Sequence, residues 1–238
     1  MKKDYALQSP ALYSDYADCI YLLKCMAKKF IYKVFILVFL IACQCNQISN
    51  SQARDSASQL YSAAGKMVKE FQYDSAMVLL RQAYEKGIEN PMQIVTDSNF
   101  YNLIDHPEYR PEIRLLLEKF AVENQTKMVR VSENGEPIIV NGLILDASNN
   151  KPLEAVQIEL VQADRNGLYF KENSMWNPRL FAYLTTNGKG EFSIRTIRPG
   201  RYKDDDGNLV PAHIHFSLKK DGYRIFGSEF AFEDESIL

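Results

Sequence analysis

Two histidines separated by one residue are the part of this sequence best suited to chemistry. His213 and His215 stand in the alternating run PAHIHFSL at 211–218, and side chains two positions apart on a β-strand point to the same face. Both imidazoles are therefore expected on one face, with Ile214 and Phe216 on the other. Neutral imidazole binds iron, zinc, copper and nickel. The pair is a candidate metal site, and two packed or solvated strand histidines are the alternative.

The beginning of the chain has the pattern of a bacterial export signal. In residues 26–42, three lysines precede the apolar run 34–42, which is shorter than the ~20 residues that a transmembrane helix needs. The letters LIAC at 40–43 resemble the lipobox of bacterial lipoproteins, which implies that Cys43 carries a lipid. A short membrane-spanning helix is the alternative interpretation.

This interpretation divides the rest of the N-terminal region and places the protein in the cell envelope. Residues 1–25 are then an upstream extension, Met26 is the start, and residues 43–54 form a polar tether to the lipid. Cys45 is the remaining free thiol, so no internal disulfide is expected. The net charge of −2 gives no general attraction to nucleic acid.

Residues 55–122 have the periodicity of helices. Apolar residues recur three and four positions apart over 55–71 and again over 76–84, which predicts an antiparallel pair, and further helices are expected on either side of His106. The segment resembles a degenerate repeat of the tetratricopeptide type, which implies a surface for a protein partner. A spacer bundle is the alternative.

The period changes to two after a polar stretch. Residues 123–136 are polar and contain an Asn-Gly pair, so they are predicted to be a linker. From 137 to 238, apolar and polar residues alternate over short runs that turn signals separate, which is typical of a β-sandwich. The predicted fold class is therefore α+β: a small helical segment followed by an all-β sandwich.

Three stretches of the β segment resemble the intradiol ring-cleavage dioxygenases, the family of the protocatechuate and catechol 1,2-dioxygenases. The stretches are 141–169, 185–202 and 211–218, and the resemblance includes none of the helical segment. Members of that family hold a non-haem ferric ion with two tyrosines and two histidines. The matching positions in this sequence are Tyr169, Tyr202, His213 and His215.

The resemblance implies Fe(3+) as cofactor and a catechol-type aromatic diol and O2 as substrates, with a muconate-type diacid as product. It also implies that Tyr202 is the axial ligand that leaves the metal and helps to deprotonate the substrate. His215 would be the other axial ligand, while Tyr169 and His213 stay equatorial. The donor set suits the ion, because ferric iron is a hard cation that favours phenolate oxygen.

One position departs from the family pattern. The residue before Pro-Ala-His-x-His is usually an arginine that stabilises charge on the substrate ring, and here it is Val210. Loss of one such preorganised donor commonly costs about a hundredfold in rate. Arg198 or Arg201 could supply the charge from another direction, whereas Arg195 is expected to face solvent.

A second function is compatible with the first strands. The runs that begin at 142, 151 and 187 also resemble the transthyretin-like sandwich modules of carboxypeptidases and outer-membrane receptors, which are non-catalytic. That resemblance implies a binding module of a cell-envelope lipoprotein. It accounts for the early strands and leaves the two tyrosines and two histidines without a role.

Overall fold

A computed structural model describes residues 52–170, 177–204 and 206–232. The chain divides into two units, Met1–Gln52 and Ala53–Leu238. The predicted upstream extension, the signal at 26–42, the lipidated Cys43 and all but the last residues of the tether lie outside the described residues. The description below concerns the second unit.

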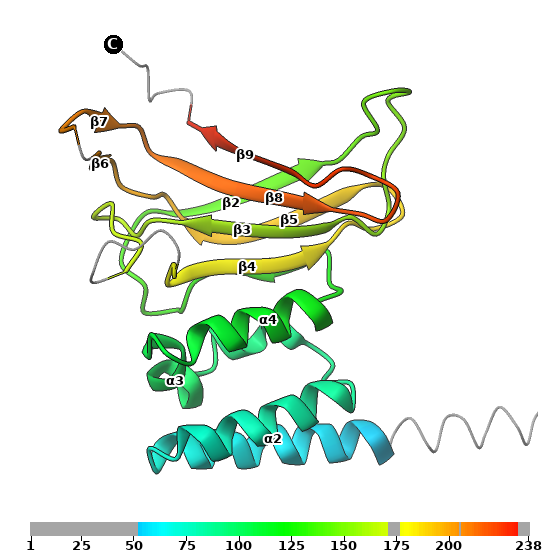
Figure 1. The fold of residues 1–238 in the computed structure, drawn as a ribbon, viewed down its shortest axis with the longest axis vertical. Helices are drawn as coiled ribbons and strands as arrows, with labels where there is room; N and C mark the ends of the chain where they lie inside the picture. The colour runs from blue at the N-terminus through cyan, green and yellow to red at the C-terminus, as the bar shows by residue number, and fades with distance from the viewer. Residues whose placement is uncertain (1–51, 171–176, 205, 233–238) are drawn as a thin grey trace, which may run out of the picture. The chain divides into compact units, whose positions relative to one another are not determined.

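The first part of this unit is helical, as predicted. A helix over 52–69 is followed by a turn in which Phe71 has a φ of 59°, and α2 then runs antiparallel to it (Figure 1). The remaining bounds are α2 Tyr73–Glu85, η1 Pro91–Val95, η2 Ser98–Phe100, α3 Tyr101–Asp105 and α4 Arg110–Phe120. Within the described ranges, no helix is both long and apolar enough to cross a membrane. The resemblance to tetratricopeptide repeats stays a prediction.

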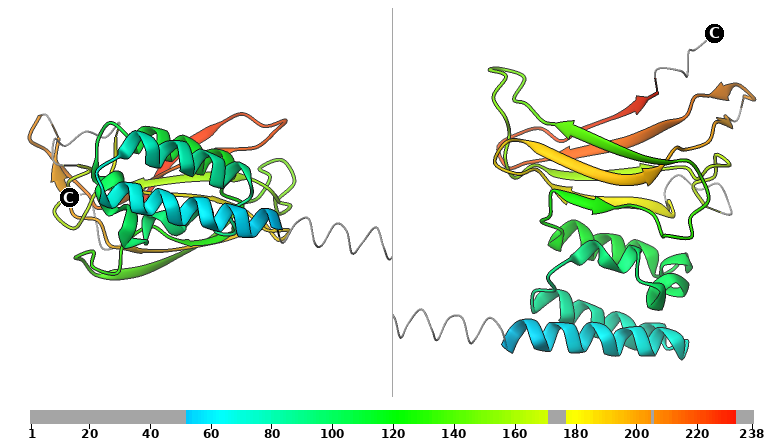
Figure 2. Two further views of the ribbon diagram at one scale, coloured as in Figure 1. Left: turned by 90° about the horizontal axis from the view of Figure 1, so that it is seen from below. Right: turned by 180° about the vertical axis from the view of Figure 1, so that it is seen from behind.

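The second part is a sandwich of two main sheets with a small ribbon beside them (Figures 1 and 2). One sheet has the order β1-β5-β2, the other the order β4-β3-β8-β9, and β6 pairs with β7. The α+β class is confirmed. The bounds are β1 Gln125–Lys127, β2 Pro137–Leu143, β3 Gln157–Gln162, β4 Leu180–Thr185, β5 Glu191–Ile197, β6 Tyr202–Lys203, β7 Leu209–Val210, β8 His213–Lys219 and β9 Phe226–Ala231.

The sandwich core lies between the two main sheets. Ile158, Leu160 and Ile194 are fully buried there, and the alternation of β3 and β5 follows from this one-sided burial. Strand β4 differs, because five consecutive residues from Leu180 are buried. Helix α4 packs on its outer face, so a continuous apolar run, rather than an alternating one, suits this strand.

The segment predicted to be a linker belongs to the fold instead. Residues 125–127 form β1, which pairs in parallel with β5, and the amide of Met128 donates to the carbonyl of Arg195 at 2.9 Å. Side chains also join the helices to the sheet, since Arg114 of α4 forms an ion pair with Glu159 of β3 at 2.6 Å. The polar composition of 123–136 reflects an exposed edge strand and its turns, not a free connection.

Candidate metal centre

The structure brings all four sequence-predicted ligands together at one end of β8. The Tyr169 hydroxyl lies 3.2 Å from Nε2 of His213, which lies 3.0 Å from Nε2 of His215. The Tyr202 ring stands edge-on to Tyr169, with centroids 5.9 Å apart, and 5.7 Å from the His213 ring. Two phenols and two imidazoles therefore surround one small space. Their role as ligands stays a prediction.

Two glycine-containing turns position the tyrosines, and the turns cross in close contact. Gly167 precedes Tyr169 by two residues, has a φ of +78°, and leaves no room for a Cβ, which would lie 2.4 Å from the carbonyl oxygen of Arg201. Gly200 precedes Tyr202 by two residues, and a Cβ there would lie 2.3 Å from the carbonyl oxygen of Arg165. Only glycine permits this approach of the two backbones.

Asp164 ties the two turns together. Its carboxylate accepts hydrogen bonds from the amides of Asn166 and Leu168, an arrangement typical of an Asx turn. Its carbonyl accepts from the amide of Gly200 at 2.8 Å. The spacing of both tyrosines from this junction is therefore set by backbone hydrogen bonds.

The hydrogen bonds of His213 determine which of its nitrogens can bind a metal. Nδ1 lies 2.7 Å from the carbonyl oxygen of Pro211, which can only accept, so Nδ1 carries the proton and Nε2 carries a lone pair. Nδ1 of His215 lies 3.4 Å from Oε2 of Glu229, in an ion-pair contact rather than a hydrogen bond. Nε2 of His213 lies 3.0 Å from Nε2 of His215 and 3.2 Å from the Tyr169 hydroxyl, so these three atoms are close enough together to bind one cation.

Burial favours the neutral forms of Tyr169 and His215 when no cation is present. Burial, followed by the neighbouring Tyr202, raises the pKa of the Tyr169 phenol far above its usual value, and burial together with His213 lowers the pKa of His215. A ferric ion has the opposite effect, since it favours phenolate and neutral imidazole. The donor set and its geometry thus fit the iron that the resemblance implies.

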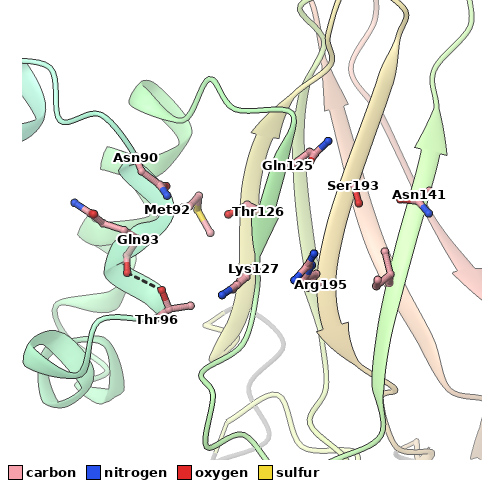
Figure 3. A pocket seen from close by; sticks show the side chains of 11 residues that line it. Asn90, Met92, Gln93, Thr96, Gln125, Thr126, Lys127, Asn141, Ser193 and Arg195 are labelled. Atoms are coloured by element: carbon pink, nitrogen blue, oxygen red, sulfur yellow. Dashed lines mark hydrogen bonds between the residues drawn. The ribbon is translucent and has the colours of Figure 1, made fainter.

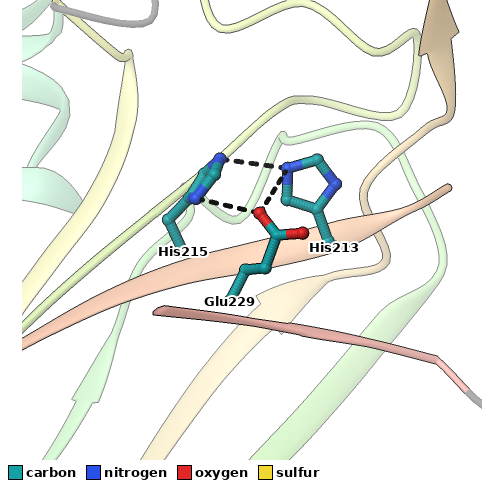
Figure 4. Close-up of side chains that lie close together, drawn as sticks. All are labelled: His213, His215 and Glu229. Carbon is teal, nitrogen blue, oxygen red and sulfur yellow. Dashed lines mark hydrogen bonds and ion pairs between the residues drawn. The ribbon is translucent and has the colours of Figure 1, made fainter. Parts of the chain in front are cut away.

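Glu229 is a polar neighbour of the site that the sequence did not reveal. It lies on β9 directly opposite His215, and its carboxylate and the two imidazoles offer ligand atoms within 4.8 Å of one another (Figure 4). The Glu229 side chain is 56 % exposed. The chain does show a candidate strand there, but only the register of β8 with β9 indicates which residue faces the histidines.

Val210 pairs with Tyr202 across the β6–β7 ribbon. The apolar side chain therefore replaces the expected arginine beside one of the predicted ligands. Arg195 lies on the exposed face of β5, as predicted, and is not part of this site. Arg198 lies over the Phe232 ring at 4.5 Å, and this contact does not assign it to the site.

Comparison with known proteins identifies the family. The Dioxygenase_C family model, described as dioxygenase, matches residues 104–238. The chain belongs to this dioxygenase family. With its relatives, the match supports an intradiol ring-cleavage dioxygenase domain, so the resemblance inferred from the sequence is confirmed. The matched range begins within the helical segment, which the sequence-based resemblance left out.

Among the dioxygenase relatives is catechol 1,2-dioxygenase of Acinetobacter baylyi, 27 % identical over 125 residues, or 42 % of this chain and 40 % of that protein. This chain thus spans about two fifths of that relative's length. Two solved structures were also matched, each over 48 % of this chain. The dioxygenase domain of a dioxygenase carbohydrate-binding protein fusion from Streptomyces sp. SirexAA-E is 28 % identical, with 68 % of it covered and a TM-score of 0.40. Catechol 1,2-dioxygenase of Acinetobacter radioresistens is 22 % identical, with 41 % covered and a TM-score of 0.41.

Proposed function

We propose that this protein is an Fe(3+)-dependent intradiol dioxygenase that cleaves a catechol-type aromatic ring with O2 to a muconate-type diacid. The observation that carries the proposal is the convergence of Tyr169, Tyr202, His213 and His215, with Nε2 of His213 within 3.2 Å of both the Tyr169 hydroxyl and Nε2 of His215, in a chain of this family. When bound, the iron supplies a Lewis acid that makes the ring reactive toward O2.

The environments of the two tyrosines support different roles. Tyr169 is 2 % exposed and its hydroxyl contacts His213, so it is held in place. Tyr202 is half-buried on a two-residue strand, and is therefore less enclosed than Tyr169. Held as a phenolate, Tyr202 would be suited to take the proton of an incoming catechol hydroxyl and become a neutral phenol, and we assign Tyr202 this role.

The histidines orient the site through contacts on their outer sides. The Pro211 carbonyl holds the His213 ring, and Glu229 faces Nδ1 of His215. The hydrogen bond to Pro211 fixes the tautomer of His213 and raises the basicity of the nitrogen that faces the metal. Nε2 of His213 is therefore available as a ligand atom.

A specific observation favours a second candidate function, a metal-holding or binding module without ring cleavage. Val210 stands beside Tyr202 where the family usually has an arginine, so an apolar side chain takes this position of the β6–β7 ribbon. Under this alternative the chain is a non-catalytic β-sandwich of the cell envelope. It would hold iron, or no metal, and would leave catechols uncleaved.

The experiment is to purify the full-length chain under air, measure iron content and record the visible spectrum. A tyrosinate-to-iron band with about one iron per chain supports the proposed centre, and Tyr202→Phe should remove or strongly shift that band. Tyr223→Phe is the matched control, because Tyr223 is exposed and donates to Asp146. An unchanged band in Tyr202→Phe would contradict the assignment of Tyr202.

Catechol, protocatechuate and hydroxyquinol are then tested with an oxygen electrode and by product analysis. O2 uptake with formation of the ring-opened diacid supports catalysis. An iron-loaded, coloured protein that consumes no O2 with any of the three would favour the non-catalytic alternative.

The proposed location is the cell envelope, through a lipid on Cys43. This follows from the lipobox-like letters at 40–43. Mass spectrometry of the protein expressed in a bacterial host should show an acylated Cys43 at the mature N-terminus, and Cys43→Ser should move it out of the membrane fraction. A protein partner of the helical segment remains part of the proposal, and crosslinking in membranes tests it.

A further inference from the structure

A second site lies on the outer face of the sheet β1-β5-β2, away from the two histidines. Segment η1 and this face enclose a pocket of about 490 Å³. Figure 3 shows Asn90 and Met92 on the η1 side, and Lys127, Arg195 and Asn141 on the strands. Nothing in the proposed ring cleavage uses this pocket.

Strand register arranges the sheet side of the pocket into two cross-strand rows. Gln125, Ser193 and Asn141 are direct neighbours across the three strands, and Lys127, Arg195 and Ile139 form the next row. The rows are two residues apart along each strand, so both lie on the same face. One row offers amides and a hydroxyl, and the other offers two cations.

The two cations, Lys127 and Arg195, have no acidic side chain beside them in the pocket. Lys127 and Arg195 are register partners on neighbouring strands, where strands lie about 4.8 Å apart, and like charges in that position repel. No aspartate or glutamate lines the pocket, and in the described part of the chain neither cation makes a side-chain hydrogen bond or ion pair. Such a pair is suited to bind an oxyanion.

The row of Gln125, Ser193 and Asn141 favours anions that also carry hydroxyl groups. The side chains of Gln125, Asn141 and Ser193 make no hydrogen bond with other described residues. Carboxamides both donate and accept, which matches hydroxyl groups rather than a bare phosphate or sulfate. A ligand that presents a carboxylate to Lys127 and Arg195 would present its hydroxyls to this row.

The pocket continues in both directions along the strands. A hollow of about 560 Å³ shares Lys127, Ile139 and Arg195 with it, and another of about 440 Å³ shares Gln125, Asn141 and Ser193. Together these three adjoining hollows form one groove along the strands, and its two outer parts also carry Glu133 and Glu191. We propose that this groove binds acidic saccharides, with the uronate carboxylate at Lys127 and Arg195.

Calorimetric titration of the full-length chain at low ionic strength tests the proposal. Galacturonate should bind, trigalacturonate should bind more tightly, and added salt should weaken both. Galactose should not bind measurably. The double variant K127Q/R195Q should bind galacturonate at least about tenfold more weakly, because two charge-assisted contacts are lost.

Two further variants keep the result interpretable. K151Q/R224Q also removes two positive charges, but from positions that do not line the pocket beside η1. This variant should bind galacturonate as the unaltered chain does. N141A should weaken galacturonate binding while leaving the response to sodium sulfate unchanged. The proposal is overturned if galacturonate does not bind, if galactose or sulfate binds as tightly, or if K151Q/R224Q weakens binding as much as K127Q/R195Q.

Discussion

Arg110 connects the helical segment to the backbone of Asn177, and its replacement by methionine should destabilise the protein strongly. The Arg110 side chain is fully buried. Its guanidinium donates to the carbonyl oxygens of Ile104, Asp105 and Asn177 at 2.7, 3.0 and 2.9 Å. Burial lowers the pKa of Arg110 to about 10, which leaves it charged at neutral pH.

The size of the effect follows from these three bonds. A hydrogen bond from a charged donor contributes about 1.5 kcal/mol or more, and Arg110→Met leaves three carbonyls without that donor. Removal of a buried charge recovers part of its desolvation cost, and methionine keeps much of the apolar contact. We therefore expect the free energy of unfolding to fall by about 3 kcal/mol.

Urea unfolding followed by circular dichroism measures this change, with Arg81→Met as the matched control. Arg81 is an exposed arginine that pairs with Glu112 on the surface, and such pairs contribute at most about 1 kcal/mol. If Arg110→Met costs no more than Arg81→Met at an unchanged m-value, the three buried bonds do not stabilise the fold as described.

Three further predictions concern the tyrosine turns, the histidines and a buried carboxyl. Gly200→Ala should lower the free energy of unfolding by about 1–3 kcal/mol, because the new Cβ would lie 2.3 Å from a backbone atom. Gly188→Ala should cost much less, since no atom lies nearer than 3.7 Å to a Cβ there. Equal urea midpoints for the two variants would contradict this. Glu229→Ala should weaken iron binding about tenfold in a chelator competition, because His215 loses the acceptor at Nδ1; an unchanged affinity would remove Glu229 from the site. Burial raises the pKa of the Glu123 carboxyl, so the native state holds its proton more tightly than the unfolded state does. The free energy of unfolding therefore falls as the pH rises from the usual pKa of 4.5 through the raised pKa of the native state. Glu123→Gln should therefore be more stable than the unaltered chain at pH 7 and lose that advantage near pH 4, and a difference that does not vary with pH would refute the assignment.

Local sequence patterns were sufficient to predict much of the fold and of the candidate metal centre. The alternation of His213 and His215 predicts a shared face from strand geometry alone, and the structure places both rings together. The sandwich and the helices also follow from periodicity. The motifs around Tyr169 and Tyr202 are sufficient by themselves to indicate the dioxygenase family.

Contacts between distant segments were decided only by the tertiary structure. Glu229 meets His215 because of the β8–β9 register, and Lys127 meets Arg195 because β1, in a segment predicted to be a linker, pairs in parallel with β5. Neither pairing has a local signal, since register depends on burial and turn geometry along the whole sheet. The burial of Arg110 likewise depends on carbonyls that only the folded chain brings to it.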